Sequence, residues 1–537
     1  MSNLFTNAEG EKKLTEIYHR LVPEAPLDYE KLVYEKKLLI LENYMQGELQ
    51  NLLRLLRDCE LIPASSGDKN WHHALATLLA SFPVYRIYGH AFPLPSGAME
   101  MVDKAFGIAH EKAPEVKAEL EHLHTLFESG EQDSEELKRE KLYFVMRSQQ
   151  FTGPLAAKGV EDTTFYNYNR LLALNEVGNS PDVFNLDRRD FHERMQYRMQ
   201  TYPHSINATA THDTKRGEGS RMRLQVLSEL PEEWEKNATE WMQLARKHSK
   251  SDGPTANDLY FILQTLLGVM PIDGKVDDTL VERVQEYLVK AFREAKVNTN
   301  WSEPNEAYET SVKNLVQQLL QEDKDFMASF KPFFQKAAHF GWLYSLCQTL
   351  LKTTCPGVPD VYQGCELWDF SLVDPDNRRP VDYEQRQQFL QEIKHNENGD
   401  ELQQELLSSP TDARVKLYLL HQVLHLRKEL KSLFDEGDYI PLKLKGQHSR
   451  HAMAFARHHE ENWCIVVVPR LLTSIISEKE LPLGEQVWGD TMVELPAEAP
   501  QNWQQLFGGQ QVQAKQSIPL AEIFKTFPVA LLTSSNA

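Results

Sequence analysis

Hydrophobic residues in the first 150 positions recur at the three-to-four-residue spacing of amphipathic helices. The pattern is clearest at 29–57, where leucines and one methionine alternate with Lys, Glu and Arg. Leucines at this spacing predict a helix that packs one face against a core. Similar patterns predict helices at 114–128 and 135–148. The segment 82–88 is rich in β-branched and aromatic residues and ends before a glycine, which predicts a short strand.

The pattern changes after residue 205. Small and β-branched residues at 206–211 predict a short buried strand, and a helical pattern begins near Ser220. The segment 355–364 predicts a second short strand. After about residue 437, short apolar runs alternate with polar turns, which predicts an antiparallel β-sandwich. Helical periodicity in between predicts seven helices, at 231–247, 257–267, 277–295, 311–320, 326–351, 383–393 and 413–430.

Composition narrows the class of protein. A formal charge of −20 over 537 residues disfavours a nucleic-acid-binding surface and suits a neutral ligand. No window reaches the roughly 20 apolar residues of a membrane span, and the N-terminus lacks the basic and apolar regions of a signal peptide. The five cysteines lack metal-ligand spacing, which predicts reduced core residues of a cytoplasmic protein. We expect no metal, no cofactor and no membrane contact.

Polar residues follow the strand predicted at 206–211. His212 and Asp213 come first, and Lys215 and Arg216 follow them. In a β/α barrel, the C-terminal ends of strands carry the catalytic groups. The alternatives are that Asp213 or the next threonine caps the following helix, and that the two basic residues form surface ion pairs.

Two further segments carry charged residues. In 149–163, Lys158, Glu161 and Asp162 lie among glycines, which predicts a loop. The alternatives to a binding role are a capped loop leading to a helix at 164–174 and ion pairs at the surface of the loop. The segment 374–380 lacks the ligand spacing of a calcium loop, so we expect it to be held by Asp–Arg pairs.

Several of these motifs resemble a known family. Thr211-His212-Asp213 is similar to the strand-seven signature of the α-amylase family of retaining glycosidases, and 357–364 resembles strand eight of that family. The resemblance runs in order from about Leu4 to the C-terminus. Three segments resemble one subgroup in particular, the maltooligosyl trehalose synthases: Thr211–Arg216, Lys158–Thr163 and Ser371–Tyr383.

The resemblance implies an α/β fold. The expected architecture is the C-terminal part of a (β/α)8 barrel of α-amylase type with large helical insertions, followed by a C-terminal antiparallel β-sandwich domain. The expected organisation is a helical insertion at 1–80, barrel strands six and seven at 81–224, a helical insertion at 225–352, strand eight with closing helices at 353–436, and the β domain at 437–537.

The resemblance also implies a reaction. In the subgroup, the reducing-end α-1,4 linkage of a maltooligosaccharide is isomerised to an α,α-1,1 linkage by intramolecular transglycosylation. Asp213 would be the third carboxylate of the site, which favours the distorted transition state, and His212 would donate to the same sugar. The other expected sugar contacts are Lys215, Arg216, Lys158, Glu161, Asp162, Tyr85 and Tyr88. The alternative for the two tyrosines is packing in the core or at the mouth of the barrel.

One part of the family pattern is absent. The nucleophile and general acid belong to strands four and five, whose signatures we do not find, and the first recognisable family strand is the sixth, at 84–88. We therefore expect the N-terminal half of the barrel to be missing, and the isolated chain to have no appreciable activity unless a partner supplies that half.

Three functions remain open at this point. The first is the C-terminal portion of a maltooligosyl trehalose synthase. The second is a non-catalytic α-glucan-binding protein. The third is a fragment of an α-amylase-type hydrolase, which Lys215–Arg216 and the Lys158 segment disfavour because they resemble the synthases.

Overall fold

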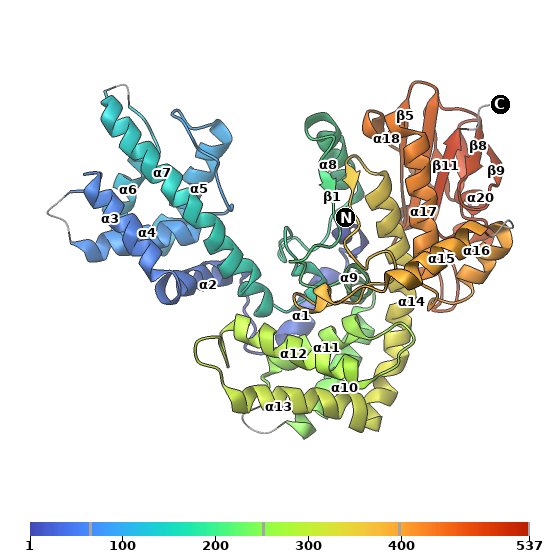
Figure 1. Cartoon of the computed structure of the whole chain (residues 1–537), viewed down its shortest axis with the longest axis horizontal. Helices are drawn as coiled ribbons and strands as arrows, with labels where there is room; N and C mark the ends of the chain where they lie inside the picture. Colours follow the sequence, from blue (N-terminus) through green and yellow to red (C-terminus); the bar gives the residue numbers. More distant parts are fainter. Residues whose placement is uncertain (64–66, 131, 250–252, 396–398, 535–537) are drawn as a thin grey trace. The chain divides into compact units, whose positions relative to one another are not determined.

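A computed structural model describes residues 1–63, 67–130, 132–249, 253–395 and 399–534. The chain forms two compact units (Figure 1). Unit 1 comprises Met1–Ala25, Asn169–Lys290 and Glu306–Ala537, and unit 2 comprises Pro26–Tyr168 and Ala291–Asn305. Most of the secondary structure is helical. None of the described helices is both long and apolar enough to cross a membrane.

Unit 2 is a helical bundle around one apolar core, to which Leu41, Leu75, Val102 and Phe144 contribute. Its helices are α2 (Tyr29–Asn43), α3 (Gln46–Asp58), α4 (Asp68–Ser81), α5 (Ser96–Lys112), α6 (Lys117–Thr125) and α7 (Glu135–Ala156). The single helix predicted at 29–57 is therefore two helices.

The segment 82–88 is not a strand, so that prediction was wrong. It consists of bends and irregular backbone. Side chains, rather than a neighbouring strand, satisfy its carbonyl groups: Thr152 Oγ1 donates to Tyr85 O over 2.8 Å, and Lys37 Nζ donates to Phe82 O over 2.8 Å. β-branched and aromatic residues favour a strand only where a partner strand is available to pair with them.

The prediction of a loop at 149–163 was also wrong, because most of this segment is helical. Helix α7 continues through Pro154 to Ala156, and a π-helix, η3 (Ala157–Glu161), follows it. The helix predicted at 164–174 is reduced to two short 3-10 turns, η4 (Thr164–Tyr166) and η5 (Leu172–Leu174). Packing of η3 against α2 overrides the local preference for a loop.

The helical part of unit 1 matches the predicted pattern closely. Its longest element is α14, a helix of 31 residues that contacts α9, α10 and α17 and is buried throughout its C-terminal half. The α-helices of unit 1 are α1 (Gly10–Leu21), α8 (Arg188–Thr201), α9 (Glu218–Gln225), α10 (Pro231–His248), α11 (Ala256–Val269), most of α12 (Asp278–Ala295), α13 (Glu306–Gln317), α14 (Lys324–Thr354), α15 (Tyr383–His395), α16 (Gly399–Leu407), α17 (Arg414–Glu429), α18 (Lys431–Asp435), α19 (Gly484–Trp488) and α20 (Leu520–Ile523).

Two very short strands in unit 1 pair in parallel. They are β1 (Ile206–Asn207) and β2 (Val358–Pro359), and Ile206 lies opposite Val358. Both strands are shorter than the segments predicted at 206–211 and 355–364. Among the described residues no third strand joins this sheet, so the barrel is not closed here.

The C-terminal part of unit 1 contains the antiparallel sheets that the sequence predicted (Figure 1, orange to red). One sheet has the strand order β3-β5-β6-β11-β8-β9 and the other β10-β7-β4. Residues of both sheets, among them Ile465, Trp503 and Val493, share one apolar core. The strands are β3 (Asp438–Pro441), β4 (Leu444–Lys445), β5 (Ala452–His459), β6 (Asn462–Pro469), β7 (Met492–Glu494), β8 (Asn502–Gln505), β9 (Gln511–Gln513), β10 (Ser517–Pro519) and β11 (Ala530–Ser534).

Candidate functional site

The predicted site segment is a compact turn just after β1. Thr214 Oγ1 donates to Thr211 O over 2.9 Å, and the Asp213 N–H donates to Thr211 Oγ1 over 3.3 Å. Helix α9 follows Gly217 without a side-chain cap, so the alternative in which Asp213 or Thr214 caps this helix is wrong. Because Thr214 instead closes the turn internally, the two residues at its tip project away from it.

His212 and Asp213 form the exposed tip of this turn. Nε2 of His212 lies 3.2 Å from Oδ2 of Asp213, and the two side chains are 58% and 66% exposed. A carboxylate and an imidazole in contact can accept from and donate to neighbouring hydroxyl groups of one ligand. Their accessibility makes this pair the candidate site of unit 1.

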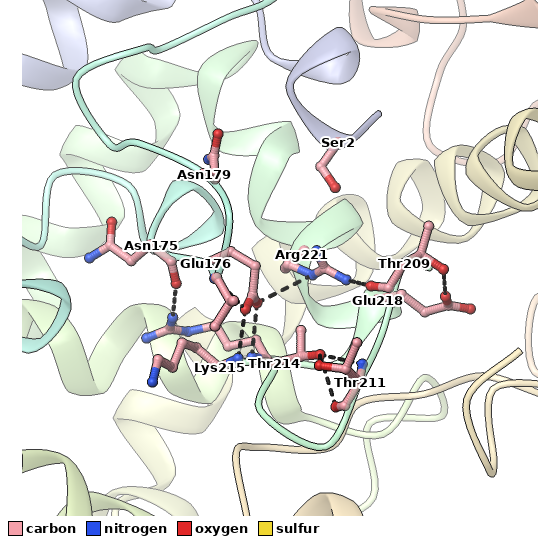
Figure 2. A network of polar contacts seen from close by, with 12 residues as sticks. Ser2, Asn175, Glu176, Asn179, Thr209, Thr211, Thr214, Lys215, Glu218 and Arg221 are labelled. Atoms are coloured by element: carbon pink, nitrogen blue, oxygen red, sulfur yellow. Dashed lines mark hydrogen bonds and ion pairs between the residues drawn. The ribbon is translucent and has the colours of Figure 1, made fainter. Parts of the chain in front are cut away.

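A buried carboxylate holds the backbone below the tip (Figure 2). Glu176 Oε1 accepts from the Lys215 N–H over 2.8 Å, and Oε2 accepts from the Arg216 N–H over 3.2 Å. Nε of Arg221 lies 3.6 Å from the same carboxylate, and the Arg221 guanidinium also donates to Thr209 O. Glu176 and Arg221 therefore fix both ends of the turn, although the sequence analysis identified neither.

The side chains of Lys215 and Arg216 point inward. Arg216 is 2% exposed, and its guanidinium donates over 3.3 Å to Leu172 O, to Asn175 O and to the hydroxyl of Tyr287. The alternative of ion pairs at the surface is therefore wrong for both basic residues, because Lys215 is buried as well. Their contact with a sugar stays a prediction.

A second buried carboxylate, Glu218, anchors the start of α9. It accepts from the hydroxyl of Thr209 and forms ion pairs with Lys416 and Lys352. Nζ of Lys352 lies 3.4 Å from Oε2 of Glu218. Burial alone would raise the pKa of Glu218, but the charges of Lys416 and Lys352 lower it well below its ordinary value. The ionised carboxylate thus links the end of the β1 segment to α14 and α17.

The loop at 374–380 supports the same turn from the other side. Asn377 Nδ2 donates to His212 O over 3.0 Å. The Asp–Arg pairs predicted for this loop are confirmed, with Arg378 Nε 2.7 Å from Asp374 Oδ1 and Arg379 Nε 2.8 Å from Asp376 Oδ1.

The other predicted residues gather in unit 2. Lys158 lies in η3, and Asp162 follows this helix directly. Nζ of Lys158 lies 2.7 Å from Oδ2 of Asp162. The hydroxyl of Tyr85 donates to Glu161 Oε1. Burial, together with this carboxylate, raises the pKa of Tyr85 far above its ordinary value, so the phenol stays protonated. These four residues form one polar cluster, in which the aromatic ring of Tyr85 is partly exposed.

Tyr88 lies on the same segment as Tyr85 but has a different environment. Its side chain is 71% exposed, and Cζ of Arg86 lies 5.3 Å from its ring centroid. Packing in the core, one of the two alternatives for these tyrosines, is therefore wrong for Tyr88, and Tyr85 is also exposed in large part. The other alternative, packing at the mouth of a barrel, stays a prediction.

Helix α2 fixes the position of η3. A Cβ atom on Gly159 would lie 2.7 Å from Cγ and 3.1 Å from Cα of Lys37, so only glycine fits this approach. Burial lowers the pKa of Lys37 to about 8. Thr163 donates back to Lys158 O over 2.8 Å and does not cap a following helix, which excludes the capped-loop alternative for this residue.

Across the described ranges, no three His, Cys, Asp or Glu side chains lie close enough together to hold a metal ion.

Comparisons with known proteins place this arrangement in context. No family model matches the chain. A protein of Mycobacterium tuberculosis, provisionally named maltooligosyl trehalose synthase, is 31% identical over 542 aligned residues, which cover all of this chain and 62% of that protein. The structure of maltooligosyltrehalose synthase from Arthrobacter ramosus superposes with a TM-score of 0.82 at 29% identity, over 99% of this chain and 62% of that one.

A structure from Sulfolobus tokodaii, described as a hypothetical maltooligosyl trehalose synthase, gives a TM-score of 0.72 at 26% identity and covers 99% of this chain and 61% of that one. The match thus extends over nearly the whole of this chain but over less than two thirds of each relative. The chain is a homologue of the maltooligosyl trehalose synthases and corresponds to 62% of the length of its curated relatives.

Proposed function

We propose that this chain contributes the strand-seven and strand-eight side of an α-amylase-type site that acts on maltooligosaccharides. In this site, β1 and β2 are the two neighbouring barrel strands. The reaction is the isomerisation of the reducing-end α-1,4 linkage to α,α-1,1 by intramolecular transglycosylation. The chemistry follows from the homology to the synthases, and the residues are those at the end of β1.

The observation that carries this proposal is the exposed contact between His212 and Asp213, 3.2 Å apart in the turn that follows β1. Asp213 would stabilise the positive charge that develops on the sugar ring in the transition state, and His212 would donate to a hydroxyl of the same ring. The buried Glu176 and Glu218 hold this tip on fixed backbone, so the pair needs little reorganisation when the charge develops.

A complete site of this class needs two further carboxyl groups. Retaining glycosidases use a nucleophile and a general acid about 5 Å apart. We propose that a further polypeptide segment supplies both groups and pairs with the β1–β2 sheet. Ile206 on β1 is 70% exposed and Val358 on β2 is exposed as well, so such a segment would cover apolar surface.

The chain of 537 residues is then expected, by itself, to bind glucan without converting it. Loss of both the nucleophile and the acid lowers the catalysed rate by on the order of a thousandfold or more. In unit 2, Lys158, Glu161 and Asp162 are proposed to bind hydroxyls, and Tyr85 and Tyr88 to stack on sugar rings.

The test is incubation of the purified chain with maltopentaose, alone and mixed with the separately produced N-terminal part of the Arthrobacter ramosus synthase. We expect reducing ends to be lost only in the mixture. Asp213→Asn should abolish this loss, whereas Asp325→Asn, which removes an exposed carboxylate at the start of α14, should not.

The other outcomes separate the alternatives. A gain of reducing ends in the mixture would indicate a hydrolase. Calorimetric binding of maltopentaose without reaction in either sample would favour the glucan-binding function. Loss of reducing ends with the isolated chain would contradict the need for a further segment.

A further inference from the structure

Unit 2 contains a hollow that the proposed function does not use. It lies between α3 and the start of α4, has a volume of about 530 Å³ and is lined by Gln50, Leu53, Arg54, Arg57, Asp68, Lys69 and His72. A volume of this size is in the range of pockets that hold small molecules, roughly 300–1,000 Å³. The two helices lie beside each other in Figure 1.

Helix geometry explains why the cationic residues meet here. Gln50, Arg54 and Arg57 lie on one face of α3, at spacings of four and three residues. Lys69 and His72 are three residues apart in the first turns of α4, so their side chains lie on one side of that helix. The wall of the hollow is therefore positively charged on both helices.

The charges in this hollow are only partly compensated. Arg57 is committed, because its Nε and Nη2 lie 3.2 Å and 2.6 Å from Oδ1 of Asp68. Within the described part of the chain, the side chains of Arg54, Lys69 and His72 make neither a hydrogen bond nor an ion pair. In a protein of formal charge −20, the unpaired charges of Arg54 and Lys69 beside one hollow create a local field that attracts an anion.

The start of α4 adds to this field. The helix follows Gly67, which has no side chain to accept from the N–H groups of the first turn. Such N–H groups and the helix dipole favour a negative group close to them. This feature supports the cationic hollow and does not stand by itself.

We propose that this hollow binds a phosphorylated small molecule, a phosphate monoester of a sugar or polyol. The guanidinium of Arg54 would bind two phosphate oxygens in a bidentate manner, and Lys69 would contribute a point charge. The volume exceeds what a phosphate group fills, and Gln50 and Asp68 offer polar atoms for hydroxyl groups of the ligand. The proposal concerns α3 and α4 only and does not depend on the glucan reaction.

The test is calorimetric titration of the full chain with glucose 6-phosphate, inorganic phosphate and glucose at low ionic strength. We expect glucose 6-phosphate to bind, inorganic phosphate to bind more weakly and glucose not to bind in this assay. Arg54→Gln/Lys69→Gln should weaken the binding of glucose 6-phosphate about tenfold or more, because charge-assisted hydrogen bonds are lost.

A matched control removes the same charges elsewhere in unit 2. Lys104→Gln/Arg147→Gln, at exposed positions of α5 and α7, should leave the affinity unchanged. All four positions are exposed, and circular dichroism checks that the variants stay folded. The single variant Lys69→Gln should show an intermediate loss.

Three results would overturn the proposal. They are the absence of binding by both phosphate compounds, equal weakening in the two double variants, and binding of glucose as tight as that of its phosphate. Binding of inorganic phosphate with the same affinity as the monoester would retain the anion site and identify free phosphate as its ligand.

Discussion

The ammonium nitrogen of Lys352 lies 3.4 Å from Oε2 of Glu218, and both side chains are almost completely buried. Lys416 contacts the other oxygen of the same carboxylate. One negative charge therefore neutralises part of two positive charges inside unit 1. The same carboxylate accepts from the hydroxyl of Thr209, two residues before the turn that exposes Asp213. The geometry makes Glu218 the central residue of this support.

Glu218→Gln should destabilise unit 1 by about 3–5 kcal/mol, because it leaves two buried lysines without a counter-charge. Urea unfolding followed by tryptophan fluorescence measures this change. Glu193→Gln, which removes an exposed carboxylate 3.8 Å from Arg189, is the matched control and should change stability by less than about 1 kcal/mol. Similar midpoints for the two variants would show that the buried triad contributes little.

The pH dependence of this contribution has a defined sign. The pKa of Glu218 is lowered in the folded protein. Its stabilising contribution is therefore fully present above the ordinary pKa of about 4.5, and is lost as the pH falls through the lowered folded value. The difference in stability between the wild type and Glu218→Gln should shrink as the solution is acidified below that pH.

Glu229 should give the opposite dependence. Burial raises its pKa to about 7, although Tyr344 and Thr473 donate to it and Arg470 lies nearby. Between pH 4.5 and 7, the unfolded chain releases this proton while the folded protein keeps it, so stability falls by about 3 kcal/mol as the pH rises. Glu229→Gln stays neutral and should lack this decline.

The measurement for Glu229 is the urea midpoint of the wild type and Glu229→Gln at several values between pH 4.5 and 8. The variant should gain stability relative to the wild type as the pH rises. A constant difference across this range would contradict the raised pKa.

Gly159→Ala should destabilise unit 2 by about 1–3 kcal/mol, because the new Cβ would lie 2.7 Å from Cγ of Lys37. Gly107→Ala in α5 is the matched control. Nothing lies within 4 Å of a Cβ at that position, and alanine should stabilise the helix by about 0.5–1 kcal/mol. Thermal unfolding of the two variants should shift in opposite directions, and a shared direction would refute the packing argument.

Asp213→Asn should leave the fold intact, because the side chain is 66% exposed. The expected change in unfolding free energy is within about 0.5 kcal/mol. The same variant should nevertheless lose all activity in the mixture with the N-terminal part of a synthase. A large loss of stability would assign Asp213 a structural role instead.

Helices with a clear apolar face could be predicted from the sequence. The segment 231–247 is a good example, since Trp234, Ala238, Trp241, Met242 and Ala245 of α10 are buried and recur every three or four positions. Local patterning fixes such elements before any tertiary contact forms.

The failures share a physical cause, which is that distant residues decide the local structure. The backbone at 82–88 is held by the side chains of Thr152 and Lys37 rather than by a strand, and η3 forms where Gly159 fits against α2. Glycine and proline at 153–154 suggested a loop, but packing of the whole segment favoured a helix. These contacts join residues more than forty positions apart, so no local pattern reveals them.

The site was predictable only in part for the same reason. A polar cluster after a β-rich segment led us to expect His212 and Asp213 at the end of a strand, but β1 ends at Asn207 and the two residues lie in the turn after it. The inward direction of Arg216 depends on the carbonyl groups of Leu172 and Asn175, about forty residues earlier in the chain. Glu176 and Glu218 resemble ordinary acidic residues of a surface, and only their partners reveal their role.

The path of the chain through the two units has a consequence for synthesis. Unit 1 begins with residues 1–25, and the chain then builds most of unit 2 before it returns to unit 1 at Asn169. Nε of Arg470 donates to Leu4 O over 2.8 Å, across 466 residues of sequence. At a translation rate of about 5–20 residues per second, Arg470 is synthesised roughly 25–90 seconds after Leu4. Leu4 is thus made long before this partner, and in that interval it lacks a hydrogen bond that holds the Leu4–Phe5 segment in the fold, where both side chains are fully buried.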